Sequence, residues 1–589
     1  SYMKLKQWLV FGLLLTGGVV VGEVESTTLI ERAESGCVDA QIKLGVCYHK
    51  GIGVEKDAGL AVQWFRKAAE QGDVNAQCIL GACYYNGMGI EKDFTESFRW
   101  YCMAAEQGNE NAQYYLGLRY FHGEGVEKNL TESVQWFRKA AEQGNADAQW
   151  NFGCCLAEGN GIYRDSEGAV QWFRKAAEQG HEKAQVSLAA CYAHGRGVAR
   201  DTAKAFEWYR KAAEQGNVEA QLFVGSCYER GTDVVMNVAE ATRWYRLAAE
   251  QRFASAQYEL SRCYALGIGV HPNADDAAYW LSLAANGGSM EAQYHMGQRA
   301  LHEVPQEASK GKEAVEWLLK AAEQGHARAQ QRLAECYALG IGVEKNMTTA
   351  VQWSRKAAEQ GNVDAQSFLG NCYYTGEGVE LNAKEAAHWL MMAAEQQNVE
   401  AQWMLAQCYA NGTGLPMDSE KAIRWYCLAA ESGHTEAQLA LGLCHDEGKG
   451  VRMDPAEAVR WYRLAAEAGN MQAQWKLGQC CYNGRGTEKE LNEAVRWIRK
   501  AAESGCAEAQ FKLGVCYSEG EGVRKESAIA FSWYRKAAEQ GLAKAQYNLG
   551  VCYSSGDGVA QDATEAKQWF QKAADQKLAE AQKALEQLL

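Results

Sequence analysis

Apolar and polar positions along the chain recur with a period of 36 residues. The dipeptide Ala-Gln marks each period, and a tryptophan recurs in step with it fifteen times, from Trp64 to Trp569. Both series keep the interval of 36 residues except at one place, where Gln293 and Gln330 are 37 residues apart. Self-similarity at a fixed period of roughly 20–50 residues is typical of repeat architectures. The pattern therefore predicts one structural unit copied along the chain.

Each period is predicted to form two helices, as residues 109–144 illustrate. Apolar or small residues three, four and seven positions after Gln113 share one helical face. A Gly-x-Gly turn at 123–125 follows, and Asn129 then suits the N-cap of a second helix, which ends before Gly144. Short polar residues occupy the same position elsewhere: Asp57, Asp93, Asp165, Asp201, Asn237, Asn346 and Asp562. Helices of about 12–15 residues are marginal alone in water, so each must pack on its neighbours.

Small residues predict that these helices cross closely. The residue four positions after the Ala-Gln glutamine, here called the ladder glutamine, is glycine in eleven of fifteen repeats and Ala189, Ser261, Ala334 or Ala406 in the others. An Ala-Ala pair follows each of the fifteen recurring tryptophans, here called the ladder tryptophans, by four and five residues. We expect the backbones to approach at these positions, with the indole and the leucine of the first helix filling the adjoining space.

The first 24 residues differ from the repeats. Lys4 and Lys6 precede an uncharged run, 7–22, that is rich in apolar residues. This layout is typical of a secretory signal, and the run is shorter than the about twenty residues of a membrane-spanning helix. Residues 1–24 are therefore predicted to be a signal peptide or N-terminal anchor, with a buried or interfacial helix as the alternative. We expect an exported protein (periplasmic, secreted or in the endoplasmic-reticulum lumen) that contacts a membrane only through this segment if it is uncleaved.

Composition narrows the class further. The chain holds 47% hydrophobic residues, with 4 prolines against 59 glycines, which excludes wholesale disorder, Pro-rich linkers and collagen. Its net charge of −14 has the wrong sign for a general nucleic-acid binder. Arginines two positions after the ladder tryptophan, such as Arg138, lie four residues before a glutamate such as Glu142. These are expected to form ion pairs on a solvated helix surface.

The cysteines are predicted to pack in the core. Thirteen of the twenty share one register, six positions after the ladder glutamine: Cys47, Cys83, Cys155, Cys191, Cys227, Cys263, Cys336, Cys372, Cys408, Cys444, Cys480, Cys516 and Cys552. Equivalent sites in neighbouring repeats should lie about 10 Å apart, whereas a disulfide needs a Cα separation of about 4.4–6.8 Å. Most are therefore expected to be free thiols. Cys83 with Cys102, and Cys408 with Cys427, are the intra-repeat pairs that could still be bridged.

No chemical motif stands out. The chain has no Cys-x-x-Cys and no His-Glu-x-x-His, and its eleven histidines are scattered over different repeats. The Gly-x-Gly turns lack the third glycine and the Lys-Ser/Thr of a phosphate loop. We predict no catalytic residue, no metal site and no cofactor.

The repeat as a whole resembles a known family. Ala-Gln-x-x-Leu-Gly-x-x-Tyr-x-x-Gly-x-Gly-Val, then Asp, then Trp-Phe/Tyr-Arg-Lys-Ala-Ala-Glu-x-Gly is similar to the Sel-1-like repeat, a relative of the tetratricopeptide repeat; the cleanest copies are Ala148–Gly180 and Ala509–Gly541. The resemblance covers residues 25–589. It implies an all-α, right-handed α-solenoid of about fifteen 36-residue helix–turn–helix repeats that acts as an adaptor for other proteins.

Within this single predicted solenoid, residues 25–36 and 579–589 are expected to be half-repeat caps, and 290–325 an irregular repeat. In the irregular repeat, the stretch 300–311 lacks Gly-x-Gly and carries Pro305 and the extra residue. It is either a tolerated insertion or a bend or contact loop between two half-arrays. Some cysteine-rich, penicillin-binding members of the family link their two helices by a disulfide, but the partner position is always alanine here.

Function is expected where the repeats differ. On the first helix these are the positions two, five and nine after the ladder glutamine, which share one face; by resemblance, first helices line the concave side. Aromatic and methionine side chains on such a face are candidate anchors for a protein or peptide, unless they lean onto the next repeat. The predicted binding residues are Tyr115, Phe223, Phe368 and Met404 at position two, with Tyr85 and Tyr374 at the neighbouring edge of this face.

Arg119 and Arg299 replace the register cysteine. A buried unpaired arginine would be very costly, so each should reach solvent or have a carboxylate partner. The sequence thus predicts a non-catalytic scaffold that binds a protein or peptide. The alternatives are a binder of cell-wall fragments or β-lactams, or weak hydrolase, like the cysteine-rich relatives, and a purely structural envelope spacer.

Overall fold

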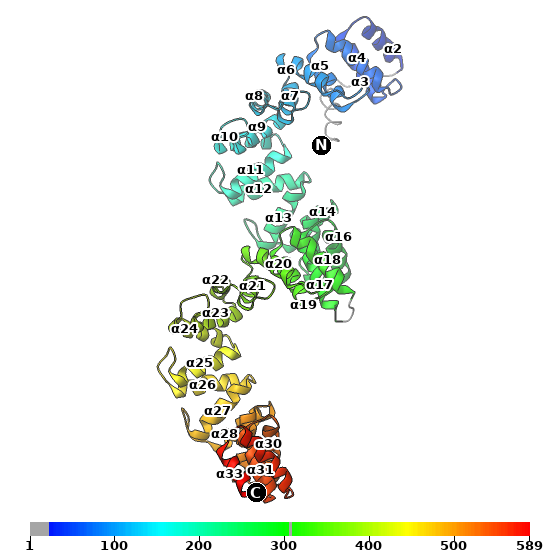
Figure 1. Cartoon of the computed structure of the whole chain (residues 1–589). Helices are drawn as coiled ribbons and strands as arrows, with labels where there is room; N and C mark the ends of the chain where they lie inside the picture. Colours follow the sequence, from blue (N-terminus) through cyan, green and yellow to red (C-terminus); the bar gives the residue numbers. More distant parts are fainter. Residues whose placement is uncertain (1–22, 306–308, 589) are drawn as a thin grey trace. The chain divides into compact units, whose positions relative to one another are not determined.

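The computed structural model describes residues 23–305 and 309–588 (Figure 1). The predicted signal segment therefore lies outside the described residues, apart from its last two positions. The described part of the chain contains 32 helices and no strand, which confirms the predicted all-α solenoid of paired helices. It divides into two compact units, the first ending at Ser289 and the second beginning at Met290.

First helices alternate with second helices along the chain. The first helices are α3 (Val38–Lys50), α5 (Val74–Asn86), α7 (Glu110–His122), α9 (Ala146–Glu158), α11 (Glu182–His194), α13 (Val218–Arg230), α15 (Ala254–Leu266), α17 (Met290–Glu303), α19 (Ala327–Leu339), α21 (Val363–Thr375), α23 (Val399–Asn411), α25 (Thr435–Glu447), α27 (Met471–Asn483), α29 (Ala507–Glu519), α31 (Ala543–Ser555) and α33 (Ala579–Leu588). The second helices are α2 (Glu23–Glu34), α4 (Ala58–Glu70), α6 (Phe94–Glu106), α8 (Leu130–Glu142), α10 (Ser166–Glu178), α12 (Thr202–Glu214), α14 (Val238–Glu250), α16 (Ala274–Asn286), α18 (Lys310–Glu323), α20 (Met347–Glu359), α22 (Ala383–Glu395), α24 (Ser419–Glu431), α26 (Pro455–Glu467), α28 (Leu491–Glu503), α30 (Ser527–Glu539) and α32 (Ala563–Asp575).

The helix boundaries follow the predicted capping residues. All eight short polar residues predicted to cap second helices accept a hydrogen bond from the backbone of the first turn, as Asn129 does from Thr131 and Glu132. Both glycines of the Gly-x-Gly turn have positive φ, 74° at Gly123 and 75° at Gly125, and Asp233 takes the second position in one repeat with φ of 61°. A Cβ at Gly125 would also lie 2.0 Å from the carbonyl oxygen of Phe94 in the preceding repeat. The second glycine of the turn therefore packs closely on the preceding repeat. The turn thus joins successive repeats as well as the two helices of its own repeat.

The close helix crossings also follow the small residues, but their partner differs from the prediction. A Cβ at Gly117 would lie 2.6 Å from Cδ1 of Phe137, the residue that follows the ladder tryptophan. The same residue faces the glycine in other repeats, as Tyr245 faces Gly225. The indoles instead lie mostly half-buried, and in nine repeats a lysine three positions later stands over the ring at 3.7–4.4 Å from its centroid.

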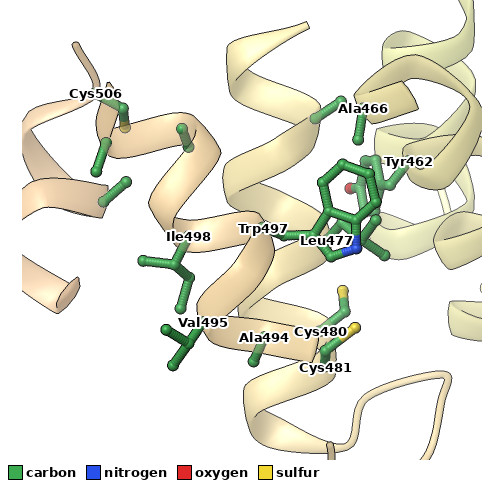
Figure 2. Packing of buried hydrophobic residues seen from close by; sticks show 14 of the residues in the cluster. Tyr462, Ala466, Leu477, Cys480, Cys481, Ala494, Val495, Trp497, Ile498 and Cys506 are labelled. Atoms are coloured by element: carbon green, nitrogen blue, oxygen red, sulfur yellow. The ribbon is translucent and has the colours of Figure 1, made fainter. Parts of the chain in front are cut away.

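The core is a series of apolar clusters that run from repeat to repeat. Figure 2 shows one of them, in which Trp497 lies among alanine, leucine and cysteine side chains of α26 to α28. Eleven of the thirteen register cysteines are buried, and all twenty cysteines are free thiols. The thiols act as small apolar groups, as their position predicted.

The nine arginines two positions after the ladder tryptophan divide into two groups. Three pair with the glutamate four residues later, as predicted: Arg138, Arg210 and Arg535. Five instead donate to the hydroxyl of a tyrosine eighteen residues later, on the next first helix: Arg66, Arg174, Arg246, Arg355 and Arg499. The ninth, Arg463, pairs with Glu493. The intrahelical prediction was wrong for these six because a partner on the neighbouring repeat competes for the guanidinium.

The ladder glutamine joins successive repeats through its buried amide. In fourteen repeats its Nε2 donates to the backbone carbonyl eight residues earlier, on the preceding second helix, at 3.0–3.3 Å. In eleven its Oε1 accepts from the side chain of a second glutamine at the end of the next second helix, at 2.7–3.0 Å. This relay of amides satisfies a buried polar group at each joint.

The second glutamine is missing at four joints, three of them successive. Gly287 replaces it in the first unit, and Ser432, Ala468 and Ser504 replace it in the second. The buried Oε1 atoms of Gln402, Gln438 and Gln474 then accept no hydrogen bond from any described residue. A buried acceptor without a donor is destabilising. The joints at Gln402, Gln438 and Gln474 therefore have one buried hydrogen bond fewer than the joints that keep the second glutamine.

Restoring the missing amide should stabilise the second unit. We expect Ala468→Gln to raise the free energy of unfolding by about 0.5–1.5 kcal/mol, because its Nε2 would donate to Gln438 Oε1. Urea unfolding, with amide hydrogen exchange of α25 and α26, measures the change. Ala468→Leu is the matched control, since it adds similar bulk without a donor. Equal stabilisation by both substitutions would contradict the relay.

Candidate functional site

A cavity of about 690 Å³ opens on the first unit, where five successive helices, α11 to α15, contribute side chains. One face of α13 supplies most of its wall. Glu219, Phe223, Ser226 and Arg230 follow one another at spacings of four, three and four residues, which aligns them on a single helical stripe, with Leu222 beside Phe223. Phe223, Ser226 and Arg230 stand two, five and nine positions after the ladder glutamine, and Glu259 and Arg262 of α15 stand at positions two and five. The variable face of the first helices thus lines this cavity.

An aromatic pair forms the apolar part of the cavity. The ring centroids of Tyr209 and Phe223 lie 4.1 Å apart. Tyr209 occupies the register that is buried against glycine in other repeats, but its own repeat has Ala189 at that position. Tyr209 is only partly buried, and its ring packs toward Phe223. The alanine alone does not set this position, because Tyr426, whose repeat has Ala406 at the same place, is buried.

A charged network closes the other end of the cavity. Arg262 Nη2 lies 2.6 Å from Glu229 Oε2, and its Nε donates to Glu259 Oε2 at 2.8 Å. The Tyr245 hydroxyl donates to the same Glu229 oxygen at 2.8 Å. The side chains of Glu229, Glu259 and Arg262 keep 18%, 29% and 30% of their surface exposed. The guanidinium is therefore fixed between two carboxylates rather than free to move.

The network sets the charge of its members. Although burial raises the pKa of the Glu229 carboxyl, hydrogen bonds from Arg262 and Tyr245 bring it below its ordinary value. Burial lowers the pKa of Arg262, but the two glutamates raise it overall. Burial and the Glu229 carboxylate both raise the pKa of the Tyr245 hydroxyl. At neutral pH the network therefore consists of an ionised Glu229, a charged Arg262 and a neutral tyrosine donor.

Of the six residues predicted from sequence, Phe223 lines this cavity. Tyr115 is partly buried and stacks on Tyr101, with ring centroids 5.2 Å apart. The Tyr85 ring lies against the guanidinium of Arg119, whose Cζ is 3.7 Å from the ring centroid. These two tyrosines have the packing role that the sequence left open as the alternative.

The other three predicted residues lie in the second unit. Phe368 is partly buried against the cluster that contains Leu369 and Cys372. Met404 is 7% exposed and belongs to the core around Leu405, and Tyr374 packs between these two clusters. All three have apolar neighbours of their own repeats, and Met404 offers little surface to a ligand.

Both arginines that replace a register cysteine have a carboxylate partner, which is one of the two outcomes that the sequence predicted. Arg119 is buried, at 4% exposed, and pairs with Glu124 at 3.1 Å. Arg299 is exposed and pairs with Glu303 at 3.3 Å. Sequence reasoning missed Glu229 and Tyr209, which stand outside the positions chosen as variable. The available signal for Glu229 was Arg262, an arginine at a variable position that needs a carboxylate partner, and the sequence carries no comparable signal for Tyr209.

Over the described ranges, no group of three or more histidine, cysteine, aspartate or glutamate side chains is placed to hold a metal ion. A search of the described helices for one long and apolar enough to span a bilayer finds none.

The protein is an all-α solenoid of repeats. Its helix pairs follow one another in tandem, and the relay of buried amides joins them at a constant spacing. The family model of the Sel1 repeat matches fifteen consecutive segments, from residues 38–73 to residues 543–578. The chain belongs to the Sel1 repeat family, whose members are generally non-catalytic scaffolds that mediate protein–protein interaction.

Two solved structures are similar in sequence. A protective antigen present in uropathogenic Escherichia coli strains, which displays an SLR fold, is 32% identical; the match covers 89% of this chain and 97% of that one, with a TM-score of 0.45. A Sel1 repeat protein from Oxalobacter formigenes is 31% identical over 53% of this chain and 91% of that one, with a TM-score of 0.43. No curated protein matches the chain.

The Glu229 network should stabilise the first unit in a pH-dependent way. A carboxyl whose pKa is depressed in the folded state contributes stability above its ordinary pKa of about 4.3, and this contribution is lost as the pH falls through the folded-state value. We expect Glu229→Gln to lower the free energy of unfolding by about 1–3 kcal/mol at pH 7. Urea unfolding at pH 7, 5 and 3.5 should show the difference shrinking below pH of about 4; a constant difference would contradict the assignment.

Cys37 should react with an alkylating reagent faster than the buried cysteines do. The backbone amide of Ala40 lowers the pKa of Cys37 against an opposing effect of burial, and Arg32, whose Nη2 lies 3.9 Å from Sγ, lowers it further. Burial raises the pKa of Cys78 and of Cys83 to about 12. We expect iodoacetamide to label Cys37 first at pH 7.5, because the thiolate is the reactive form. Peptide mapping after timed alkylation measures the order, and Arg32→Gln should slow Cys37.

Proposed function

We propose that the chain is a non-catalytic scaffold that binds a peptide segment of another protein through the concave face of its first helices, at the cavity of α11 to α15. The observation that carries this proposal is the position of the cavity wall: Phe223, Ser226, Arg230, Glu259 and Arg262 occupy the variable positions two, five and nine of the first helices, which the shared scaffold does not use. Phe223 is the central anchor, with Leu222, Val186 and Tyr209 beside it.

The lining suits a polypeptide. Apolar and aromatic side chains supply contact area, while the Arg262 network and Ser226 supply polar groups at one side. The α13 stripe from Glu219 to Arg230 holds twelve residues and is about 16 Å long, a length that an extended peptide covers with about five residues. A binder of cell-wall fragments and a structural spacer are the competing functions.

Peptide selection on the full-length chain tests the proposal. A displayed library of random twelve-residue peptides is selected on the wild-type chain, and the enriched peptides are measured by fluorescence anisotropy. We expect Phe223→Ala to weaken their binding by roughly tenfold or more, as truncation of a central aromatic anchor does. Phe368→Ala is the matched control, because it removes the same side chain at the same register in the second unit.

The outcomes are distinct. Loss with Phe223→Ala and unchanged binding with Phe368→Ala supports the cavity as the peptide site. Equal loss with both variants, or no enriched peptide that depends on Phe223, overturns it. A muropeptide or β-lactam that binds in a Phe223-dependent way where peptides do not would favour the ligand-binding alternative.

We also propose export from the cytosol, on the strength of Lys4, Lys6 and the apolar run that follows them. Fractionation of cells that express the whole chain, with mass determination of the mature N-terminus, tests this placement. A chain found in the cytosol with residues 1–24 intact would contradict it.

A further inference from the structure

We propose that the Glu219 end of the cavity binds a cationic side chain, lysine or arginine, of the bound peptide. This inference rests on the proposed function and adds the chemistry of the partner. It also gives the peptide a direction, because the cation must lie at the N-terminal end of α13.

The two ends of the cavity differ in charge. One end, here called the far end, is the one that the Arg262 network closes. There the carboxylates of Glu229 and Glu259 stand beside the guanidiniums of Arg262 and Arg230, so the negative and positive charges balance. At the near end, Glu219 lies in the first turn of α13, is exposed, and forms no ion pair with any described residue. The cavity therefore has one uncompensated negative charge, and it lies at one end.

Aromatic faces stand beside that charge. Tyr209 and Phe223 form the tilted aromatic pair in the cavity wall, with ring centroids 4.1 Å apart. Glu219 lines the same cavity, one helical turn before Phe223 on α13. In keeping with this placement, burial raises the pKa of Tyr209 and the Glu219 carboxylate raises it further, by a smaller effect. A carboxylate next to aromatic rings attracts a cation through both the ion pair and the ring quadrupole. The methylene stem of a lysine or arginine would meanwhile cover the apolar rings.

The far end does not offer the same site. Arg262 is held by two carboxylates, and Glu229 also accepts from Tyr245, so the charges of both carboxylates already face a guanidinium. An anionic group there would meet carboxylates as well as guanidiniums. The whole chain carries a net charge of −14, which also favours the approach of a basic segment.

The experiment uses the peptides selected on the wild-type chain that depend on Phe223. We expect them to be enriched in lysine or arginine next to an apolar residue. Glu219→Gln should weaken a selected peptide by about tenfold at low salt, the loss expected for one charge-assisted contact. The effect should shrink as the ionic strength rises, because this glutamate is exposed. Replacing the peptide's basic residue with norleucine should weaken wild-type binding to the same extent.

Asp364→Asn is the matched control. Asp364 is an exposed acid in the first turn of α21, two residues before its ladder glutamine, as Glu219 is in α13. Its replacement should leave binding unchanged. The two substitutions, in the protein and in the peptide, should also be coupled: with Glu219→Gln, the norleucine peptide should lose little more.

Failure of this inference can be told from failure of the proposed function. Peptides that need Phe223 but carry no basic residue, or that bind Glu219→Gln as tightly as wild type, overturn the cationic site and leave the peptide site standing. A selection without any Phe223-dependent peptide overturns the proposed function itself. Coupled losses with Glu219→Gln and norleucine, and none with Asp364→Asn, support the inference.

Discussion

A buried side-chain amide at each joint is the interaction on which this array depends. The ladder glutamine donates to one second helix and accepts from the next, so three successive helices meet at a single polar group. An unpaired amide in this position would be destabilising, and it is satisfied only when the neighbouring repeats stand in the correct register. The glutamine thus specifies how one repeat sits on another, whereas the apolar side chains around it supply the driving force. This division of labour explains why the Ala-Gln dipeptide recurs in every repeat.

The cavity arises where one copy departs from the shared pattern. Glycine at the helix crossing lets the residue after the ladder tryptophan sink into the core, as Phe137 does against Gly117. In the repeat of Tyr209 the residue at the crossing is Ala189, and the tyrosine ring is only partly buried and lies against Phe223 of the next first helix. Tyr426 is buried although its repeat also has alanine, Ala406, so the ring position depends on the neighbouring repeats as well. The cavity is therefore a property of several adjacent repeats rather than of one residue.

Much of the fold could be predicted from sequence because the determinants are local. Helix pairs, N-caps such as Asn129 and the glycines of the turn depend on residues a few positions apart. The candidate site was only partly predictable, since its parts come from neighbouring repeats. Position alone marked Phe223 as variable, but the same reasoning chose Met404, which is buried in the core around Leu405. Whether a variable side chain faces solvent depends on the neighbouring helix, and periodicity within one repeat does not contain that information.

The incomplete relay should make one stretch of the second unit less stable in the cold than the rest. Gln402, Gln438 and Gln474 lack their amide donors, yet two of the largest buried apolar clusters, around Leu405 and around Trp497, span the same repeats. These joints therefore rely on the burial of apolar surface more than the others do. Apolar burial weakens on cooling, whereas hydrogen-bonded joints do not share that loss. Chilling should thus loosen the array first between residues 402 and 504, and leave the amide-linked repeats on either side intact.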